Sequence, residues 1–198
     1  MSRLLIATTN PGKQAEFRRL LGTLHAEIVT PDELGLGLEV DEPHDTYAEN
    51  ATAKAIAFTS ASGLASVADD SGIEVAALDW GPGVRSARWA GDRGREADRL
   101  LEALDGIEDR RARMVCALAL ATPLSDAPPT VEVFTGVMEG TIARERKGSG
   151  GFGYDPVFVI EGGTTTAELP EGEKDRLSHR GRAVAAALPR LREVLGEI

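Results

Sequence analysis

The stretch 66-SVADDSGIEV-75 carries an apolar run into two adjacent aspartates, Asp69 and Asp70, and out again into a second apolar run. Ser71 and Gly72 are residues that turns recruit, so the pattern predicts a strand, a turn and a second strand at Ile73 to Ala77. Neighbouring residues of an extended strand point to opposite faces. Only one of the two carboxylates can therefore face a given site, and we expect the other to take structural hydrogen bonds.

The aspartate pair has two interpretations. Asp, Ser and Gly together are typical of an ordinary turn. Alternatively, one aspartate is a ligand of Mg²⁺. A hard cation of this kind also needs a second carboxylate nearby and phosphate oxygens of a bound ligand. The acidic residues Glu39, Asp41 and Glu42 supply that carboxylate, unless their variable, glycine-rich segment is only a solvated loop.

Upstream of this stretch, the chain reads as strand, loop and helix. Leu4 to Thr8 is an apolar run that predicts a buried strand, and the loop TTNPGK follows at Thr8 to Lys13. Apolar residues then recur at helical spacing from Phe17 to Leu24. A second helix, from Thr46 to Phe58, opens with the capping-box sequence TYAE.

Downstream, helices and strands continue to mix. Glu96 to Leu104 predicts an amphipathic helix, and the alternating runs Met114 to Ala121 and Val131 to Val137 predict paired strands. The glycine-dense loop GSGGFGYDPVFVI, Gly148 to Ile160, leads into another strand. The sequence SHRGRAVAAALPRLREVL predicts a closing helix that Pro189 kinks or divides. The fold class is therefore mixed α/β.

Length and composition are those of an ordinary globular protein. The chain has 198 residues, of which 42% are hydrophobic and 27% charged, and we expect one domain over residues 1–198. The 32 acidic residues against 22 basic ones give a net charge of −10. A nucleic-acid groove needs a continuous basic stripe, so this charge argues against one, whereas a small anion needs only a few local cations.

Two further observations bear on the cellular setting. The first apolar run is too short for a signal peptide or a membrane span and no longer one follows, so we expect a cytoplasmic protein with no membrane partner. Cys116 is the only cysteine, which excludes a disulfide framework or a thiolate metal site within one chain. We expect Cys116 to be a small buried residue.

Three motifs suggest ligand chemistry, and each has a plain alternative. TTNPGK places backbone N–H groups and Lys13 at a helix N-terminus, where anions bind, although Asn-Pro-Gly is also a common turn. GGFGYD offers aromatic rings that can stack on a flat base, or it is a tight turn with ordinary packing. EKDRLSHRGRA puts cations at a second helix start, where Ser178 suits an N-cap better than a nucleophile because no acid partner is evident.

The order of these motifs, together with ENA ahead of Lys54, ADDSG and GVRSARWAG, resembles the inosine triphosphate pyrophosphatase family over essentially the whole chain. The resemblance implies an elongated, mixed-sheet α/β fold of two lobes with an active-site cleft between them, assembled as a homodimer. It also implies Mg²⁺-dependent hydrolysis of ITP, dITP and XTP to the monophosphate and pyrophosphate. Such an activity removes deaminated purines from the nucleotide pool.

The resemblance also implies roles by position. Asp70 matches the proton acceptor and a metal ligand, and Glu42 matches a second metal ligand. Lys13, Lys54 and Lys174 would neutralise phosphate charge, and Tyr154 would be a stacking ring. The positions that match substrate contacts are Thr8, Thr9, Asn10, Pro11, Gly12, Lys13, Lys54, Ser71, Phe152, Gly153, Tyr154, Asp155, Lys174, His179 and Arg180.

Base specificity and two competing functions complete the interpretation. Donors such as Arg180 and backbone N–H groups, aimed at a keto oxygen at position six of the base, would reject the amino group of adenine. A Maf-type nucleotide pyrophosphatase, which prefers pyrimidine or modified nucleotides, is one alternative, and the motifs GGFGYDP and SHRGRA speak against it. A catalytically silent nucleotide sensor is the other, and the intact Asp70, Lys13 and Lys174 speak against that.

Overall fold

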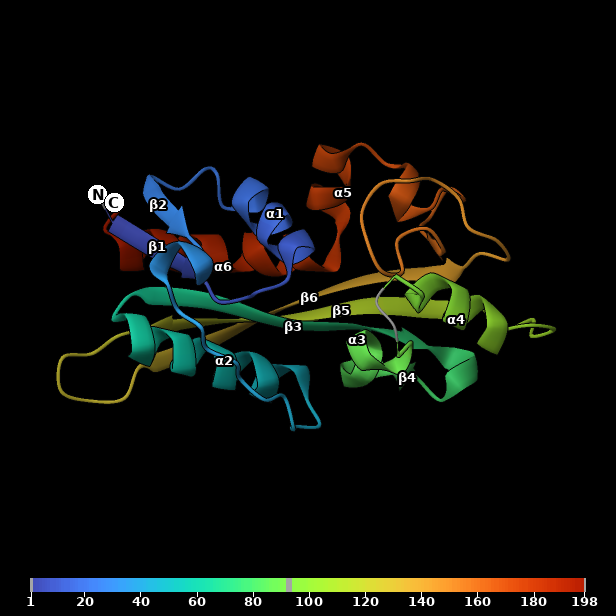
Figure 1. Cartoon of the computed structure of the whole chain (residues 1–198). Helices are drawn as coiled ribbons and strands as arrows, with labels where there is room; N and C mark the ends of the chain where they lie inside the picture. Colours follow the sequence, from blue (N-terminus) through green and yellow to red (C-terminus); the bar gives the residue numbers. More distant parts are fainter. Residues whose placement is uncertain (1, 92–93, 198) are drawn as a thin grey trace. The chain divides into compact units, whose positions relative to one another are not determined.

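A computed structural model describes residues 2–91 and 94–197 of the chain (Figure 1). These residues group into two compact units. The first unit holds the described residues of Met1–Asp70, Cys116–Gly136 and Arg180–Ile198, and the second holds those of Ser71–Val115 and Val137–His179. Within the described residues, no helix combines the length and the apolar composition that a membrane span requires.

The strands form a mixed sheet in the order β2-β1-β3-β5-β6-β7, and β4 pairs with β3 beside this path. Their bounds are β1 (Ser2–Ile6), β2 (Ala26–Val29), β3 (Ala65–Val75), β4 (Gly81–Pro82), β5 (Arg111–Thr122), β6 (Thr130–Ile142) and β7 (Phe158–Val159). β1 lies parallel to β2 and β3, whereas β4 is antiparallel to β3 and β7 is antiparallel to β6. With its helices, this sheet confirms the predicted α/β class, and β5 and β6 are neighbours as expected.

Helices α1 and α2 begin at residues whose side chains cap them. The bounds of the helices are α1 (Pro11–Leu20), α2 (Tyr47–Ser62), α3 (Ser86–Trp89), α4 (Glu96–Ala103), α5 (Glu171–Leu177) and α6 (His179–Leu195). The side chain of Asn10 caps α1 by accepting a hydrogen bond from the N–H of Lys13 at 3.1 Å. Thr46 Oγ1 accepts from the N–H of Glu49 at 3.2 Å and donates to its carboxylate at 2.7 Å, so Thr46 caps α2 at the position that the sequence TYAE predicts, with the first of the two hydrogen bonds of a capping box.

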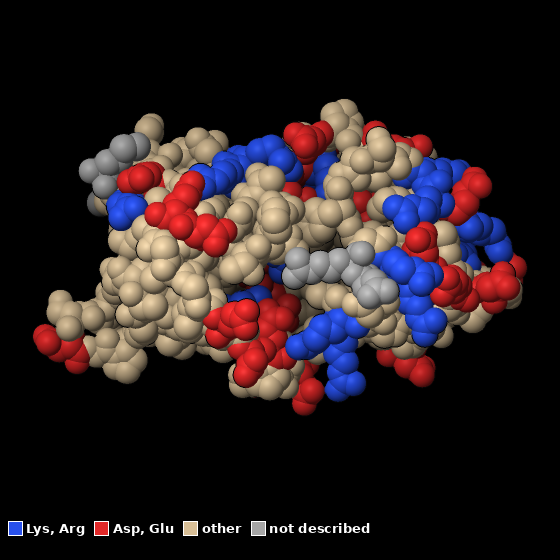
Figure 2. All heavy atoms as spheres, in the orientation of Figure 1, with Lys and Arg blue, Asp and Glu red and all other residues tan. Residues whose placement is uncertain are grey.

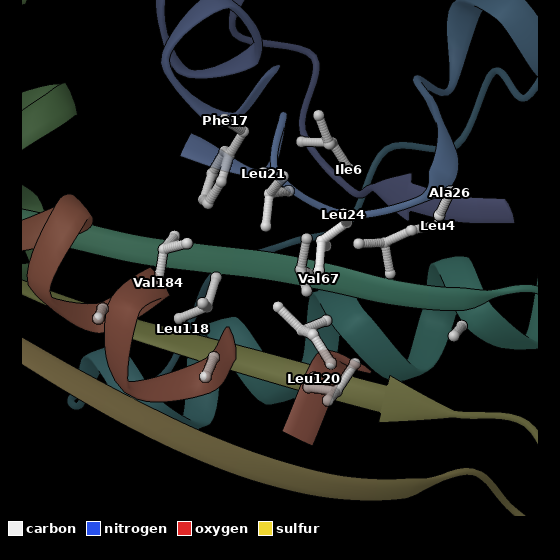
Figure 3. Close-up of a cluster of buried hydrophobic side chains, with 14 of the residues drawn as sticks. Leu4, Ile6, Phe17, Leu21, Leu24, Ala26, Val67, Leu118, Leu120 and Val184 are labelled. Atoms are coloured by element: carbon white, nitrogen blue, oxygen red, sulfur yellow. The ribbon is translucent and has the colours of Figure 1, made fainter. Parts of the chain in front are cut away.

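The core of the first unit lies on both faces of its strands. Val67 of β3 packs with side chains of β1, α1 and α6 on one face, as Figure 3 shows. Ala68, the next residue, belongs to a separate cluster on the other face, which α2 covers (Figure 1). Because side chains alternate along a strand, the Asp69 side chain lies on the same face of β3 as Val67, and the Asp70 side chain lies on the same face as Ala68. The core therefore fixes the face that each aspartate serves.

The second unit has a core of its own. Ile73 and Val75, at the end of β3, pack with apolar residues of α4, β5 and β6. Tyr154 joins this cluster with 8% of its surface exposed, and its hydroxyl donates to the carbonyl of Ser86 at 2.9 Å. Ser86 Oγ in turn accepts from the N–H of Ile73 at 2.8 Å. The loop that carries Tyr154 is thereby fixed to β3.

The predicted turn at Ser71 and Gly72 is wrong. β3 runs without interruption from Ala65 to Val75, and a 3₁₀ turn begins at Ala76. The extended backbone beyond Gly72 is held by the hydrogen bond from Ile73 to Ser86 and by the pairing of Glu74 and Val75 with β4. These contacts outweigh the local turn preference, as tertiary pairing often does.

Two other differences from the sequence-based predictions concern helix α6 and strand β2. Pro189 does not divide α6, which continues from His179 to Leu195. Buried residues on both sides of Pro189, among them Ala187 and Leu191, hold the helix on the core and compensate for the missing backbone hydrogen bond. The four-residue strand β2 was not expected, because its sequence AEIV carries little strand periodicity.

Charged side chains of both signs are interspersed on the face that Figure 2 shows. Exposed ion pairs join some of them, for example Arg144 with Glu108 and Arg146 with Asp98, each at 2.9 Å. Exposed pairs of this kind contribute about 0–1 kcal/mol each. The fold therefore depends on its three apolar clusters and on the buried ion pairs described next.

Candidate functional site

Asp69 is the centre of a buried ion cluster in the first unit, and its side chain has no exposed surface. Its Oδ1 lies 3.1 Å from Nζ of Lys13, and its Oδ2 accepts from Nε and Nη2 of Arg180 at 3.2 and 2.9 Å. Its backbone carbonyl accepts from Nζ of Lys54 at 2.6 Å. One residue thus positions three of the predicted substrate-binding cations, which confirms the expectation that one of the two aspartates takes structural contacts.

These cations also set the protonation state of Asp69. Burial opposes ionisation, but the charges of Lys13 and Arg180 outweigh it and hold the pKa of the Asp69 carboxyl well below its ordinary range. Asp69 therefore stays ionised throughout the physiological pH range, and it offsets part of the positive charge around it.

Arg180 bonds to a second carboxylate, that of Glu16 on α1. The guanidinium is 2% exposed and lies 5.7 Å from the ring centre of Phe17. Burial lowers the pKa of Arg180, but the charges of Asp69 and Glu16 raise it beyond its ordinary value. The structure thus places Arg180 in a buried pairing with Asp69 and Glu16, and its predicted contact with the base stays a prediction.

Asp70 lies on the opposite face of β3, toward α2, and is 5% exposed. Its Oδ2 accepts from Nδ2 of Asn50 at 3.0 Å. Burial raises the pKa of Asp70 above its ordinary value, and the negative charge of Glu42 adds to this effect against the opposing charges of Lys54 and Lys13. Glu42 itself forms an ion pair with Lys54. The structure therefore brings the two predicted metal ligands, Asp70 and Glu42, into electrostatic contact.

The two carboxylates suit a magnesium ion that is shared with a substrate. Magnesium in nucleotide enzymes is commonly held by one or two carboxylates, with phosphate oxygens and water in the other positions. Within residues 2–91 and 94–197, no set of three or more His, Cys, Asp or Glu side chains forms a self-sufficient metal cage. Asp70 and Glu42 repel each other, and a cation between them would relieve that repulsion.

The loop ahead of α1 is held in shape by its own polar groups. Thr8 Oγ1 accepts from the N–H of Asn10 at 3.3 Å, and the carbonyl of Thr8 accepts from Nε2 of Gln14 at 2.8 Å. Pro11, Gly12 and Lys13 form the first turn of α1 rather than part of the loop. The positive end of a helix dipole and the Lys13 ammonium thus lie together, an arrangement that favours an anion.

In the second unit, the predicted residues gather around Asp155. Its Oδ2 accepts from the N–H of Phe152 at 2.7 Å and from Nζ of Lys174 at 2.5 Å, and its Oδ1 accepts from Thr166 Oγ1 at 2.8 Å. Gly151 has φ +70°, and a Cβ there would lie 2.0 Å from Asp155 Oδ2. The loop therefore needs glycine at this position, both for its backbone conformation and for the approach of the carboxylate.

The two aromatic residues of this loop differ in exposure. Phe152 is 37% exposed as a residue, and Nζ of Lys174 lies 5.3 Å from the centre of its ring. Tyr154 lies in the core of the second unit, so its ring serves packing, and the exposed ring available for stacking is that of Phe152. Gly153, which lies between them, has φ +63°.

The remaining predicted contacts lie at the margins of these groups. Ser71 is half-buried on β3, and His179 is half-buried at the first position of α6. Thr9 is exposed in the loop ahead of α1. The contacts of these residues with substrate stay predictions.

Sequence reasoning did not select Glu16, Asn50 or Thr166 as site residues, although each contacts one. Glu16 lies three residues after Lys13 on α1, and Asn50 lies four residues before Lys54 on α2. Residues at these spacings share a helix face. Helical periodicity could therefore have identified Glu16 and Asn50, whereas Thr166 lies 11 residues from Asp155 and had no such signal.

The chain matches known proteins over nearly all of its length. The model of the Ham1 family matches residues 4–190. The dITP/XTP pyrophosphatase of Methylococcus capsulatus is 45% identical and that of Nitrosomonas europaea 48% identical; the alignments cover 98% of this chain in both cases, and 98% and 96% of the relatives. A HAM1 protein structure from Coxiella burnetii has a TM-score of 0.83 with 38% identity, over 98% of this chain and 100% of that one.

Proposed function

This chain belongs to the Ham1 family, and from that premise we propose that it hydrolyses ITP, dITP and XTP to the nucleoside monophosphate and pyrophosphate. Relatives 40–48% identical over nearly the whole chain are named dITP/XTP pyrophosphatases. The observation that carries the proposal is the cluster of Lys13, Lys54 and Arg180 around Asp69, directly beside the buried Asp70. A triphosphate requires cations of this kind to neutralise its charge, and a carboxylate beside them can accept a proton from the attacking water molecule.

Asp70 is the proposed proton acceptor. Hydrolysis breaks the bond between the α and β phosphates, water adds to phosphorus, and the proton that water loses needs an acceptor. Burial raises the pKa of Asp70, which makes its carboxylate a better base than that of an exposed aspartate. Asn50, which donates to one of its oxygens, orients the carboxylate.

The cations and the metal divide the charge of the triphosphate. Lys13 and Lys54 neutralise phosphate oxygens, and phosphoryl transfer depends mainly on such neutralisation and on in-line positioning. Asp70 and Glu42 would hold Mg²⁺, which supplies Lewis-acid stabilisation of the phosphate charge and a more acidic water. Asp69 keeps Lys13 and Arg180 in place without itself contacting substrate.

The second unit provides the groups that we propose for the base. The exposed ring of Phe152 stacks on the purine, and the ion pair of Asp155 with Lys174 holds the loop that carries this ring. Donors aimed at the keto oxygen at position six would favour hypoxanthine and xanthine over adenine. Because Arg180 donates to Asp69 and Glu16, we favour backbone N–H groups over Arg180 for this role.

The proposal extends to properties that the resemblance implies. The active form is a homodimer in the cytoplasm, and its metal is Mg²⁺. Residues 1–198 act as a single pyrophosphatase domain. The reaction removes deaminated purines from the nucleotide pool. Size-exclusion chromatography with light scattering tests the dimer, and replacement of Mg²⁺ by Ca²⁺ or chelator tests the metal.

The decisive experiment measures pyrophosphate release from ITP, XTP, GTP, ATP and dTTP in parallel, with Mg²⁺ and with chelator. Fast, metal-dependent release from ITP and XTP, and little from ATP, is the expected result. A preference for dTTP would support a Maf-type pyrophosphatase instead. Binding of ITP without turnover of any nucleotide would support a sensor and remove Asp70 from its assigned role.

A further inference from the structure

Asn50 uses its entire side-chain amide at the proposed metal site. It is fully buried on α2. Its Oδ1 accepts from the backbone N–H of His44 at 3.1 Å. Its Nδ2 donates to the backbone carbonyl of His44 at 3.2 Å and to Oδ2 of Asp70 at 3.0 Å. The amide thus offers one acceptor and two donors, and each has a partner.

The contacts to His44 matter because of where His44 lies. It follows Glu42 by two residues, in a segment between η1 (Asp32–Leu34) and α2 that has no regular secondary structure. By pairing with both backbone groups of one residue, Asn50 binds this segment as a neighbouring strand would. The position of the Glu42 backbone therefore depends on an amide that also contacts Asp70.

We propose that Asn50 is a positioning residue that holds Asp70 and the Glu42 segment together as a metal site; this inference rests on the proposed function for the identity of the two ligands. Partners that orient metal ligands typically change metal affinity or activity by about 10- to 100-fold when they are replaced. Alanine at position 50 would remove the donor to Asp70 and both contacts to His44 at once.

α2 offers a matched control for burial and polarity. Thr59 is 1% exposed on the same helix, and its Oγ1 lies 2.6 Å from Oγ of Ser66. Thr59→Val therefore removes a buried polar contact from α2 with almost no change in volume, away from Asp70 and Glu42. A general loosening of α2 would affect both variants alike, whereas a role in metal positioning affects Asn50→Ala alone.

The test measures Mn²⁺ binding directly, by electron paramagnetic resonance of the free ion, in wild type, Asn50→Ala, Asn50→Ser and Thr59→Val. Each protein is first shown to be folded by circular dichroism. We expect Asn50→Ala to weaken Mn²⁺ binding by about 10- to 100-fold, Asn50→Ser by less because its hydroxyl can still donate to one partner, and Thr59→Val to bind as wild type does. If Asn50→Ala does not fold, Asn50→Ser decides.

Two outcomes would overturn the proposal: metal affinity unchanged in the Asn50 variants, or an equal loss in Thr59→Val. Wild-type protein that binds no Mn²⁺ would overturn it as well. Failure of the proposed function is distinguishable, because it appears as absence of nucleotide hydrolysis in wild type. In that case the binding comparison still shows whether Asn50 organises a metal site.

Discussion

Oδ1 of Asp69 lies 3.1 Å from Nζ of Lys13, and this pair joins the first turn of α1 to β3 within the first unit. The lysine proposed to meet phosphate is therefore held by a buried carboxylate, not left to move in solvent. Such preorganisation reduces the entropy lost when a ligand binds. Asp70, on the other face of β3, is the residue proposed to accept the proton and to bind the metal.

Asp70→Asn should abolish turnover. Asparagine keeps the size of the side chain and can still contact Asn50, but it cannot accept a proton from water. We expect kcat for ITP to fall by about 100-fold or more, the usual contribution of a general base. Equilibrium binding of ITP should survive in part, because Lys13 and Lys54 remain, and near-normal turnover would exclude Asp70 as proton acceptor.

Asp69→Asn should reduce the stability of the protein and not only its rate of turnover. The substitution leaves the half-buried Lys13 and the buried Arg180 beside a neutral group, and removal of one partner from a buried ion pair typically reduces the free energy of unfolding by about 3–5 kcal/mol. Urea unfolding measures this change. Glu132→Gln is the control, since its pair with Arg190 is exposed and should change stability by less than about 1 kcal/mol. An equal loss of unfolding free energy in Asp69→Asn and Glu132→Gln would argue that Asp69 does not stabilise the fold through its pairs with Lys13 and Arg180.

The same carboxyl should make stability depend on acid pH. The pKa of Asp69 is lower in the folded protein than in the unfolded chain, where it is about 3.9. The unfolded chain then binds the extra proton, so the stabilisation is complete above this value and declines as pH falls below it. Between pH 5 and pH 3, wild type should lose more unfolding free energy than Asp69→Asn, and parallel losses would contradict the assignment.

Cys116 should be inert in the folded protein. Burial, together with the negative charge of Asp69, raises the pKa of its thiol to about 12, and the side chain has no exposed surface. A thiol reagent reacts with the thiolate. Ellman's reagent at pH 8 should therefore detect no thiol in native protein and one per chain in guanidinium chloride. Rapid reaction of the native protein would show that the core around Cys116 opens readily.

Gly151→Ala should disturb the Asp155 loop more than its backbone conformation alone explains. Both Gly151 and Gly163 have positive φ, +70° and +85°, but only at Gly151 would a Cβ meet Asp155 Oδ2 and Lys174 Nζ, at 2.0 and 2.8 Å. Gly163→Ala should reduce the unfolding free energy by about 1–2 kcal/mol through the left-handed backbone alone. Gly151→Ala should reduce it further and raise KM for ITP, and equal losses with unchanged KM would refute the difference.

Local signals in the sequence predicted much of the fold. The sequence TYAE at Thr46 and the apolar run from Leu4 are patterns within a few residues. Helix α2 begins where the first pattern predicts it, and β1 (Ser2–Ile6) overlaps the strand expected over Leu4 to Thr8. The turn expected at Ser71 failed because Ser86, 13 residues after Ile73, and β4 hold that segment extended. Local preference could not anticipate contacts of that range.

The site divides in the same way. The loop at Thr8 and the pair of aspartates on β3 were selected from residue type and spacing, but the partners of Arg180 were not. Glu16 and Arg180 are 164 residues apart, and only the packing of α1 beside α6 on one face of the sheet joins them. A guanidinium expected to contact a base was therefore found between two carboxylates.

Because side chains alternate along β3, the order of Asp69 and Asp70 determines which carboxylate lies on which face of the sheet. Three parallel pairings with β1, from Ala65 to Val67, fix the register of the strand just ahead of them. A single residue inserted or deleted between Val67 and Asp69 would exchange their faces: the cation-holding carboxylate would turn toward α2, and the proposed base would turn toward Lys13 and Arg180. The spacing from β1 to the aspartates is therefore under the same constraint as the aspartates themselves.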